Sequence, residues 1–173
     1  MKRLFIPLAL VMVMVLPSCL KNKAEYTPYI SFSHFILNPV YHGDTLVWAE
    51  DTLNITINED DQFVLDTVEV GDTIVFAVGY GSYANDLQAA RILVADSTGM
   101  RYSVLLNEAI RSVLVSEQVD GSGVNLELQS GYNYLAFPAG CKILKSGTHR
   151  VEFKVESDSK YSPNSYIFLQ PVR

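Results

Sequence analysis

The side chains in this sequence best suited to contact a ligand are aromatic. Tyr80 and Tyr83 lie in a glycine-rich stretch (GYGSY), Tyr161 lies in a polar stretch, and Trp48 is the only tryptophan. An exposed flat ring can stack on the face of a sugar while its polar tip makes a hydrogen bond. Packing within loops, or burial of Trp48 in the core, is the alternative role. The sequence therefore offers a glycan-binding surface as one hypothesis.

Residues that could hold a metal or do acid–base chemistry are scattered. The three histidines (His34, His42 and His149) lack the spacing of metal ligands. The acidic run 58–61 (NEDD) lacks the alternating ligands of a calcium loop, and we expect a solvated hairpin there. No nucleophile elbow, phosphate loop or zinc-protease motif occurs. We expect no catalytic residue, metal or cofactor, and a hydrolase using paired carboxylates is a minor alternative.

The N-terminal residues have the layout of a secretory signal. Lys2 and Arg3 precede an uncharged apolar run over residues 4–16, which ends at Pro17. This run is shorter than the roughly 20 apolar residues that span a bilayer. We therefore expect residues 1–18 to form a signal peptide that is removed on export.

The end of that run, Leu16-Pro17-Ser18-Cys19, resembles the lipobox of bacterial lipoproteins. The resemblance implies that Cys19 is acylated, which would hold the protein at a membrane through several acyl chains. Residues 19–27 would then be the lipidated cysteine and a tether, and residues 28–173 the folded domain. The expected location is the outer membrane, on its periplasmic side or at the cell surface. Cys141 would have no intrachain partner and is expected to be a buried, inert thiol.

Length and charge narrow the class of protein. Of the 173 residues, about 155 remain after cleavage, which suits one domain. The net charge is -6 and no Lys/Arg cluster follows the signal, so a nucleic-acid partner is not expected. Ten tyrosines are typical of a sheet-rich fold.

Short runs of β-forming residues recur along the chain, separated by turn signals. The predicted strands are 29–37, 45–48, 52–57, 63–70, 73–78, 89–95, 101–106, 113–115, 124–128, 132–137, 148–156 and 165–169. One helical turn is expected over 107–112, capped by Asn107. Such spacing of short strands predicts a sandwich or a barrel.

Several details of these elements are specific expectations. Alternation in 52–57 puts Leu53, Ile55 and Ile57 on one face. Residues 79–86 are expected to form a loop, and Pro138 to end its strand. Residues 96–99 are expected to be a hairpin turn that joins 89–95 to 101–106.

Two stretches, 68–76 (VEVGDTIVF) and 147–153 (GTHRVEF), resemble strands of bacterial immunoglobulin-like modules. The resemblance extends in pattern over residues 63–173. It implies an all-β fold, an immunoglobulin-like antiparallel β-sandwich with at most one short helix. Together with the lipobox, it makes the chain similar to Bacteroidota-type exported lipoproteins. Such modules serve adhesion, glycan binding or spacing, so the fold alone assigns no function.

Asp followed by Ser or Thr recurs in the chain, similar to O-glycosylation sites of exported Bacteroidota proteins. The candidate acceptors are Thr45, Thr52, Thr67, Thr73 and Ser97. The alternative is structural, because Asp favours turns and Thr favours the start of a strand.

These features favour a non-enzymatic, lipid-anchored binding or adhesion module of the cell envelope. Its expected partners are the membrane through Cys19 and a glycan or another envelope protein. The alternative is a structural accessory subunit of an outer-membrane or pilus-like assembly, in which a sheet edge pairs with a partner strand. The sequence leaves the oligomeric state open.

Overall fold

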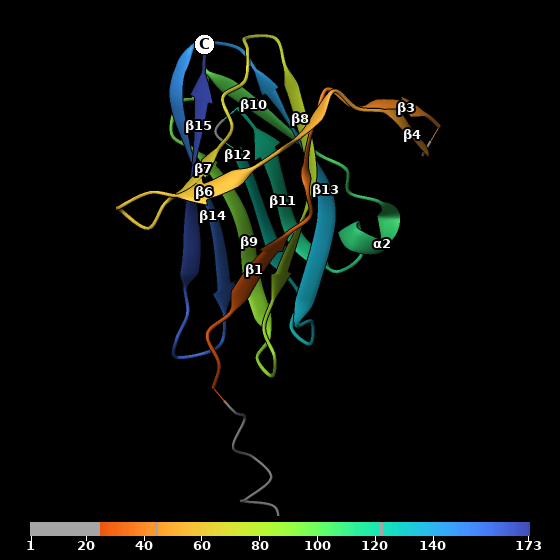
Figure 1. Cartoon of the computed structure of the whole chain (residues 1–173). Helices are drawn as coiled ribbons and strands as arrows, with labels where there is room; N and C mark the ends of the chain where they lie inside the picture. The colour runs from red at the N-terminus through yellow and green to blue at the C-terminus, as the bar shows by residue number, and fades with distance from the viewer. Residues whose placement is uncertain (1–24, 44, 122) are drawn as a thin grey trace, which may run out of the picture.

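Two stacked β-sheets, a separate two-stranded hairpin and one short helix make up the described part of the chain in the computed structural model (Figure 1). The structure describes residues 25–43, 45–121 and 123–173. The predicted signal peptide and the lipidation of Cys19 lie outside these residues. Within them, no helix combines the length and the apolar character needed to cross a bilayer. The all-β sandwich with one short helix confirms the predicted fold class.

One sheet has six strands, and all its neighbouring strands are antiparallel. Its order is β10 (Met100–Val104), β13 (Tyr134–Ile143), β8 (Thr73–Gly81), β2 (Phe35–Leu37) and β5 (Asp51–Leu53), and β1 (Tyr29–Phe32) also pairs with β8. Because β1 and β2 pair with opposite ends of β8, residues 29–37 run along the whole of that strand.

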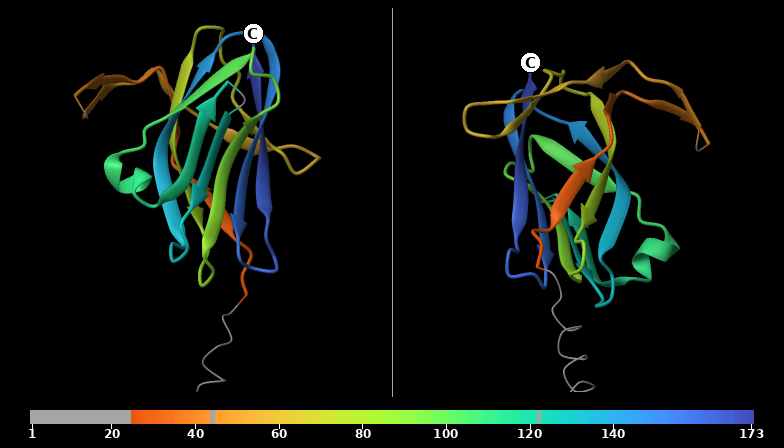
Figure 2. Two further views of the ribbon diagram at one scale, coloured as in Figure 1. Left: turned by 180° about the vertical axis from the view of Figure 1, so that it is seen from behind. Right: turned by 60° about the horizontal axis from the view of Figure 1, so that its bottom comes forward.

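The other sheet has seven strands. Its order is β11 (Leu114–Asp120), β12 (Gly123–Leu128), β9 (Leu87–Val94), β14 (Gly147–Ser157), β15 (Asn164–Val172), β7 (Phe63–Leu65) and β6 (Ile55–Ile57). Its pairs are antiparallel except β7 with β15, which is parallel. A separate two-stranded hairpin, β3 (Val40–His42) with β4 (Thr45–Trp48), projects beyond the sandwich (Figure 2).

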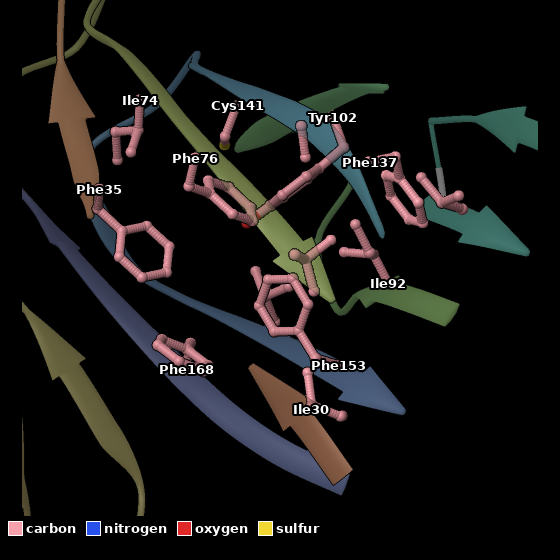
Figure 3. Packing of buried hydrophobic residues seen from close by; sticks show 14 of the residues in the cluster. Ile30, Phe35, Ile74, Phe76, Ile92, Tyr102, Phe137, Cys141, Phe153 and Phe168 are labelled. Atoms are coloured by element: carbon pink, nitrogen blue, oxygen red, sulfur yellow. The ribbon is translucent and has the colours of Figure 1, made fainter. Parts of the chain in front are cut away.

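Alternating side chains from both sheets fill the space between them. Phe153 on β14 is buried, and its ring lies 4.9 Å from Phe32, 5.2 Å from Phe168 and 5.8 Å from Phe76, measured between centroids (Figure 3). These edge-on contacts are a favoured geometry for aromatic pairs. The predicted inward faces of 124–128 and 148–156 are buried, which confirms the alternation found in both segments.

The predicted helical turn is confirmed as α2 (Glu108–Arg111). The side-chain oxygen of Asn107 accepts a hydrogen bond from the Ile110 N–H at 2.9 Å, as expected of a helix N-cap. The turn connects β10 of one sheet to β11 of the other.

Two predicted strands are divided in the structure. Residues 29–37 form β1 and β2, interrupted at Ser33, whose backbone and hydroxyl both bond to Ala77. Residues 52–57 pass from the six-stranded to the seven-stranded sheet at Asn54, whose N–H donates to the Asp66 carboxylate at 2.8 Å. The prediction of one apolar face was therefore wrong: Leu53 is buried, whereas Ile55 and Ile57 are exposed.

Two further expectations were wrong because the sheet tolerates glycine and proline. Gly79, Tyr80 and Gly81 belong to β8 rather than to a loop. Pro138 lies inside β13, and its carbonyl accepts the Leu105 N–H at 3.0 Å. The N–H and C=O of one strand residue point to the same side of the strand. The place of the missing N–H of Pro138 therefore also faces Leu105, one residue beyond the end of β10.

The turn at 96–99 forms as predicted, with the Asp96 carboxylate accepting hydrogen bonds from Thr98 that hold its pKa below its usual range. It does not make a hairpin, however. The strands it connects, β9 and β10, belong to different sheets.

Candidate functional site

The β3–β4 hairpin exposes large apolar side chains. Its side chains Val40, Tyr41 and Trp48 are 51%, 46% and 55% exposed. An isolated two-stranded hairpin is at best marginally stable in water, since it has little apolar surface to bury. This hairpin stands away from the sandwich and presents these side chains to solvent (Figures 1 and 2).

Asn38 fixes the point where the chain leaves the sheet for the hairpin. Its side-chain oxygen accepts the Thr73 N–H at 2.8 Å, and its Nδ2 donates to Glu50 at 2.7 Å and to Asp72 at 2.8 Å. The Glu50 N–H in turn donates to the Leu37 carbonyl at 3.0 Å. Both ends of the hairpin are therefore tied to the six-stranded sheet. Asn38 has a positive φ of 45°, which asparagine tolerates better than most residues.

A groove of about 730 Å³ lies between this hairpin and the outer face of the six-stranded sheet. Its lining includes Tyr41 and Gly43 from the hairpin and Val75, Ser103, Leu105, Pro138 and Gly140 from the sheet side. Most of these side chains are small or apolar, and Leu105 is 69% exposed. Hydroxyl groups come only from Tyr41 and Ser103 among the named residues. The groove suits an apolar ligand that approaches the backbone closely.

The four aromatic residues predicted for ligand contact do not converge. Trp48 is exposed on the hairpin, so the alternative that it lies in the core is wrong. The hairpin side chain that lines the groove is Tyr41, not Trp48. Tyr83 and Tyr161 are exposed at the opposite end of the sandwich, where β8 ends and β15 begins.

Tyr80 cannot contact a ligand, and its prediction as a contact residue is corrected. The side chain is fully buried, its hydroxyl donates to the Arg91 carbonyl at 3.0 Å, and its ring stacks on Phe137. Burial raises the pKa of Tyr80 well above its usual value. Its place on the inner face of β8, between two glycines, explains why the GYG stretch resembled a loop.

A second groove, of about 520 Å³, is polar and lies over the seven-stranded sheet. Arg91 pairs there with Glu156, and Lys154 lies 2.9 Å from the same carboxylate. Partial burial alone would raise the pKa of Glu156, but hydrogen bonds from Lys154 and Arg91 hold it below its usual range. A general acid needs the opposite shift. These charges form a connected network of ion pairs along the groove.

The carboxylates at the edge of this polar groove also serve the fold. Asp86 accepts the Gly131 N–H at 2.9 Å, and Asp158 accepts the Asp86 N–H at 2.8 Å. The acidic run 58–61 is a hairpin turn organised by the side chain of Asn58, which accepts the N–H groups of Asp60 and Gln62. This arrangement agrees with the expected solvated hairpin.

No cluster of three or more His, Cys, Asp or Glu that could hold a metal occurs among residues 25–43, 45–121 and 123–173. His149 is buried, and its Nε2 lies 2.7 Å from the Lys145 carbonyl, over Gly99. Cys141 is buried with no disulfide partner, and burial raises the pKa of its thiol to about 12. A thiol in this state is a poor nucleophile, in agreement with the inert role expected for it.

The candidate O-glycosylation residues differ in access. Thr45, Thr52, Thr67 and Ser97 are exposed. Thr73 is half-buried, and its hydroxyl accepts a hydrogen bond from Lys142 at 3.3 Å. Modification of any of them stays a prediction.

Sequence reasoning missed the groove because its walls come from distant parts of the chain. Tyr41, Val75, Leu105 and Pro138 share no local pattern. The one usable signal was the apolar stretch on either side of His42-Gly43, which indicates a hairpin whose side chains have no obvious core to enter.

The sequence matches no protein-family model and no curated protein. Among solved structures, the chain resembles a DUF4466 family protein from Parabacteroides merdae, with a TM-score of 0.44 and 11% identity over 83% of this chain and 44% of that one. This chain thus spans less than half the length of that protein.

Two other solved structures show weaker likeness. The bacterial hydrophobin BslA has a TM-score of 0.38 and 10% identity over 87% of this chain and 98% of that one. A family 123 glycoside hydrolase from Clostridium perfringens has a TM-score of 0.33 and 14% identity over 64% of this chain and 23% of that one. All three similarities are distant, with sequence identities of 10–14%.

Proposed function

We propose that this protein is a non-enzymatic binding module of the cell envelope, anchored through a lipid on Cys19, as in Bacteroidota-type exported lipoproteins. Its ligand is an apolar segment of another envelope protein, held in the groove between the β3–β4 hairpin and the six-stranded sheet. The observation that carries the proposal is the hairpin itself, which exposes large apolar side chains beside an apolar groove.

The exposed side chains give a reason for a partner to bind. Fully burying a large apolar side chain is worth about 1.5–3 kcal/mol. Tyr41 and Leu105 face one groove and are 46% and 69% exposed. Contiguous apolar surface of this kind on a soluble domain indicates an interaction site.

The lining of the groove favours a protein segment over a sugar. Gly140, Pro138 and Ser103 let a backbone approach the sheet closely, whereas a sugar needs several polar partners. Glycan binding is a second candidate, because Trp48 is 55% exposed and offers a stacking surface on the same hairpin. Binding on a glycan array that is lost in Trp48→Ala and kept in Tyr41→Ala would favour the glycan.

Pairing through a sheet edge, as in an assembly subunit, has weaker support. The edge strand β11 is seven residues long and exposes Val115 and Val119, but it also carries Glu117 and Asp120. Charged side chains on an edge strand oppose pairing with another chain. The other edge of that sheet, β6, has only three residues.

Site-specific photo-crosslinking tests the proposal. A photoreactive phenylalanine analogue replaces Tyr41 or Leu105 in the full chain, expressed in its native envelope. A matched control carries the analogue at Ser116, which is exposed on β11. We expect one crosslinked protein from positions 41 and 105 and none from position 116. Equal crosslinking at all three positions, or none in the groove, would contradict a protein ligand there.

A further inference from the structure

Loops 82–86, 129–133 and 158–163 lie at one end of the sandwich, which we call the base. Residues 25–28 of the chain are held against this end. The Glu25 carboxylate accepts the Lys160 N–H at 2.9 Å, and Asn164 donates to the Pro28 carbonyl at 2.9 Å. Pro28 is buried. Residues 25–28 are thus held against the base before β1 begins.

Tyrosines gather at this base. Exposed in its loops are Tyr83 (69%), Tyr132 (40%) and Tyr161 (52%); beside them are Tyr26 (48%) in the segment held against the base and Tyr134 (53%) at the first position of β13. The rings of Tyr26 and Tyr83 meet edge to face, with centroids 5.5 Å apart. Among the residues that the structure describes, the other exposed aromatic side chains are Tyr41 and Trp48 on the hairpin, at the far end (Figure 1).

We propose that the base is a membrane-contacting surface, whose tyrosines lie among the headgroups of the bilayer that holds the lipid on Cys19. This inference rests on the proposed anchor. Cys19 is six residues before Glu25, and six extended residues span at most roughly 20 Å. Since residues 25–28 are fixed to the domain, the base cannot move far from the membrane surface.

The chemistry of the base fits the boundary between headgroups and acyl chains. Tyrosine is enriched at membrane–water interfaces, because its ring is apolar and its hydroxyl remains hydrated. The Lys160 ammonium lies 5.0 Å from the centre of the Tyr161 ring and can reach a headgroup phosphate. The nearby carboxylates of Asp86 and Asp158 accept backbone N–H groups of these loops. The surface suits a zwitterionic phosphatidylethanolamine bilayer rather than a strongly anionic one.

Such contact also orients the binding site. The hairpin lies at the end of the sandwich opposite the base (Figures 1 and 2), and its residues Tyr41 and Gly43 line one side of the groove. A domain standing on its base would hold the hairpin, and with it one side of the groove, away from the bilayer that anchors it.

Tryptophan fluorescence in vesicles tests this inference, because Trp48 is the only native tryptophan. The full chain, produced with its native processing, is reconstituted into phosphatidylethanolamine–phosphatidylcholine vesicles whose acyl chains carry bromine, a contact quencher. Two variants carry Tyr83→Trp or Tyr161→Trp in a Trp48→Phe background. Two controls report from the far end: the native chain, and Tyr41→Trp in the same background.

We expect positions 83 and 161 to lose most of their emission and positions 41 and 48 to keep theirs. Flotation of the same samples reports the anchor separately. If the protein floats with the vesicles but is quenched at none of these positions, or equally at both ends, the proposal that the base contacts the membrane is wrong. The proposed anchor is unaffected by that result. A protein that does not float overturns the anchor, and the inference falls with it. Crosslinking in the groove depends on neither result.

Discussion

Tyr29 and Gly81 form a cross-strand pair in which the tyrosine ring occupies the space of the missing side chain. A Cβ atom on Gly81 would lie 2.3 Å from Cζ of Tyr29. On the other side of β8, the hydroxyl of Tyr134 lies 2.7 Å from the position of a Cβ on Gly79. Tyrosines from both flanking strands thus cover the two glycines, which explains how a glycine-rich stretch remains a strand.

Gly81→Ala should destabilise the protein by about 1–2 kcal/mol, because the Tyr29 ring must move from its place against β8. Chemical denaturation measures the change. Gly121→Ala is the matched control, since its nearest neighbour lies 3.7 Å away, and it should change stability by less than about 0.5 kcal/mol. In a Tyr29→Ser background the effect of Gly81→Ala should shrink. An equal effect in both backgrounds would mean that the ring is not the cause.

Asn38→Ala should loosen the β3–β4 hairpin. It removes three side-chain hydrogen bonds and places alanine at a positive φ, with an expected loss of stability of about 2 kcal/mol. Asn38→Gly keeps the backbone conformation and should cost about 1 kcal/mol. Both variants should speed amide exchange in residues 40–48 and weaken crosslinking in the groove. Unchanged exchange there would show that Asn38 does not hold the hairpin.

Stability should fall at alkaline pH. The Cys141 thiol ionises near 9.0 when unfolded, but burial raises its folded pKa to about 12, with a partial offset from a hydrogen bond of Tyr102. Between these values the unfolded state binds fewer protons, so the free energy of unfolding decreases as pH rises, by at most about 1.4 kcal/mol per pH unit. Burial also raises the pKa of Tyr80 and Tyr102 above 10.0, which adds to the loss at higher pH.

The measurement is urea unfolding at a series of pH values from 7 upward. Cys141→Ala should remove the decline between pH 9 and 10 while the steeper loss from the tyrosines remains. It should also lower stability at pH 7 by about 1 kcal/mol through lost packing. An identical pH dependence in wild type and variant would contradict the shifted thiol.

Cys19→Ser should release the protein from the membrane fraction, because the proposed acyl chains would attach to that cysteine. Intact-mass measurement of natively produced protein should show an N-terminus at Cys19 with added acyl mass.

The same spectrum tests O-glycosylation: added hexose mass that disappears in Thr52→Ala or Ser97→Ala would identify an acceptor. Thr73→Ala should have no such effect, since that hydroxyl is half-buried under Lys142.

Local periodicity predicted the strands whose two faces have different environments. Residues 148–156 alternate in sequence and in burial, because one face packs on the core and the other meets solvent. The same pattern failed for 52–57. Periodicity predicts which side chains of a strand share a face, but it does not predict which sheet the strand joins. Here the chain passes from one sheet to the other at Asn54. Ile55 and Ile57 remain exposed for that reason.

The candidate site was less predictable than the fold. Exposure of Tyr83 and Tyr161 followed from their polar surroundings, but no sequence signal placed them at the end where the chain enters. Tyr80 has similar neighbours in sequence, yet tertiary packing buries it. The groove depends on pairings between β8, β10 and β13 that bring distant residues together, which a single sequence does not specify locally.

The segment 29–37 joins the base directly to the hairpin and pairs with β8 through β1 at one end and β2 at the other. If the anchor pulls at one end and a partner in the groove at the other, the load that enters through the hairpin follows the backbone of this segment alone. The load that enters through Leu105 and Pro138 must cross the hydrogen bonds between β8 and β1, which would be loaded along the strand axis, so that many bonds must break together. The domain would then resist detachment through hydrogen bonds loaded in shear, and most of the sandwich would serve as the rigid body to which β1 is attached.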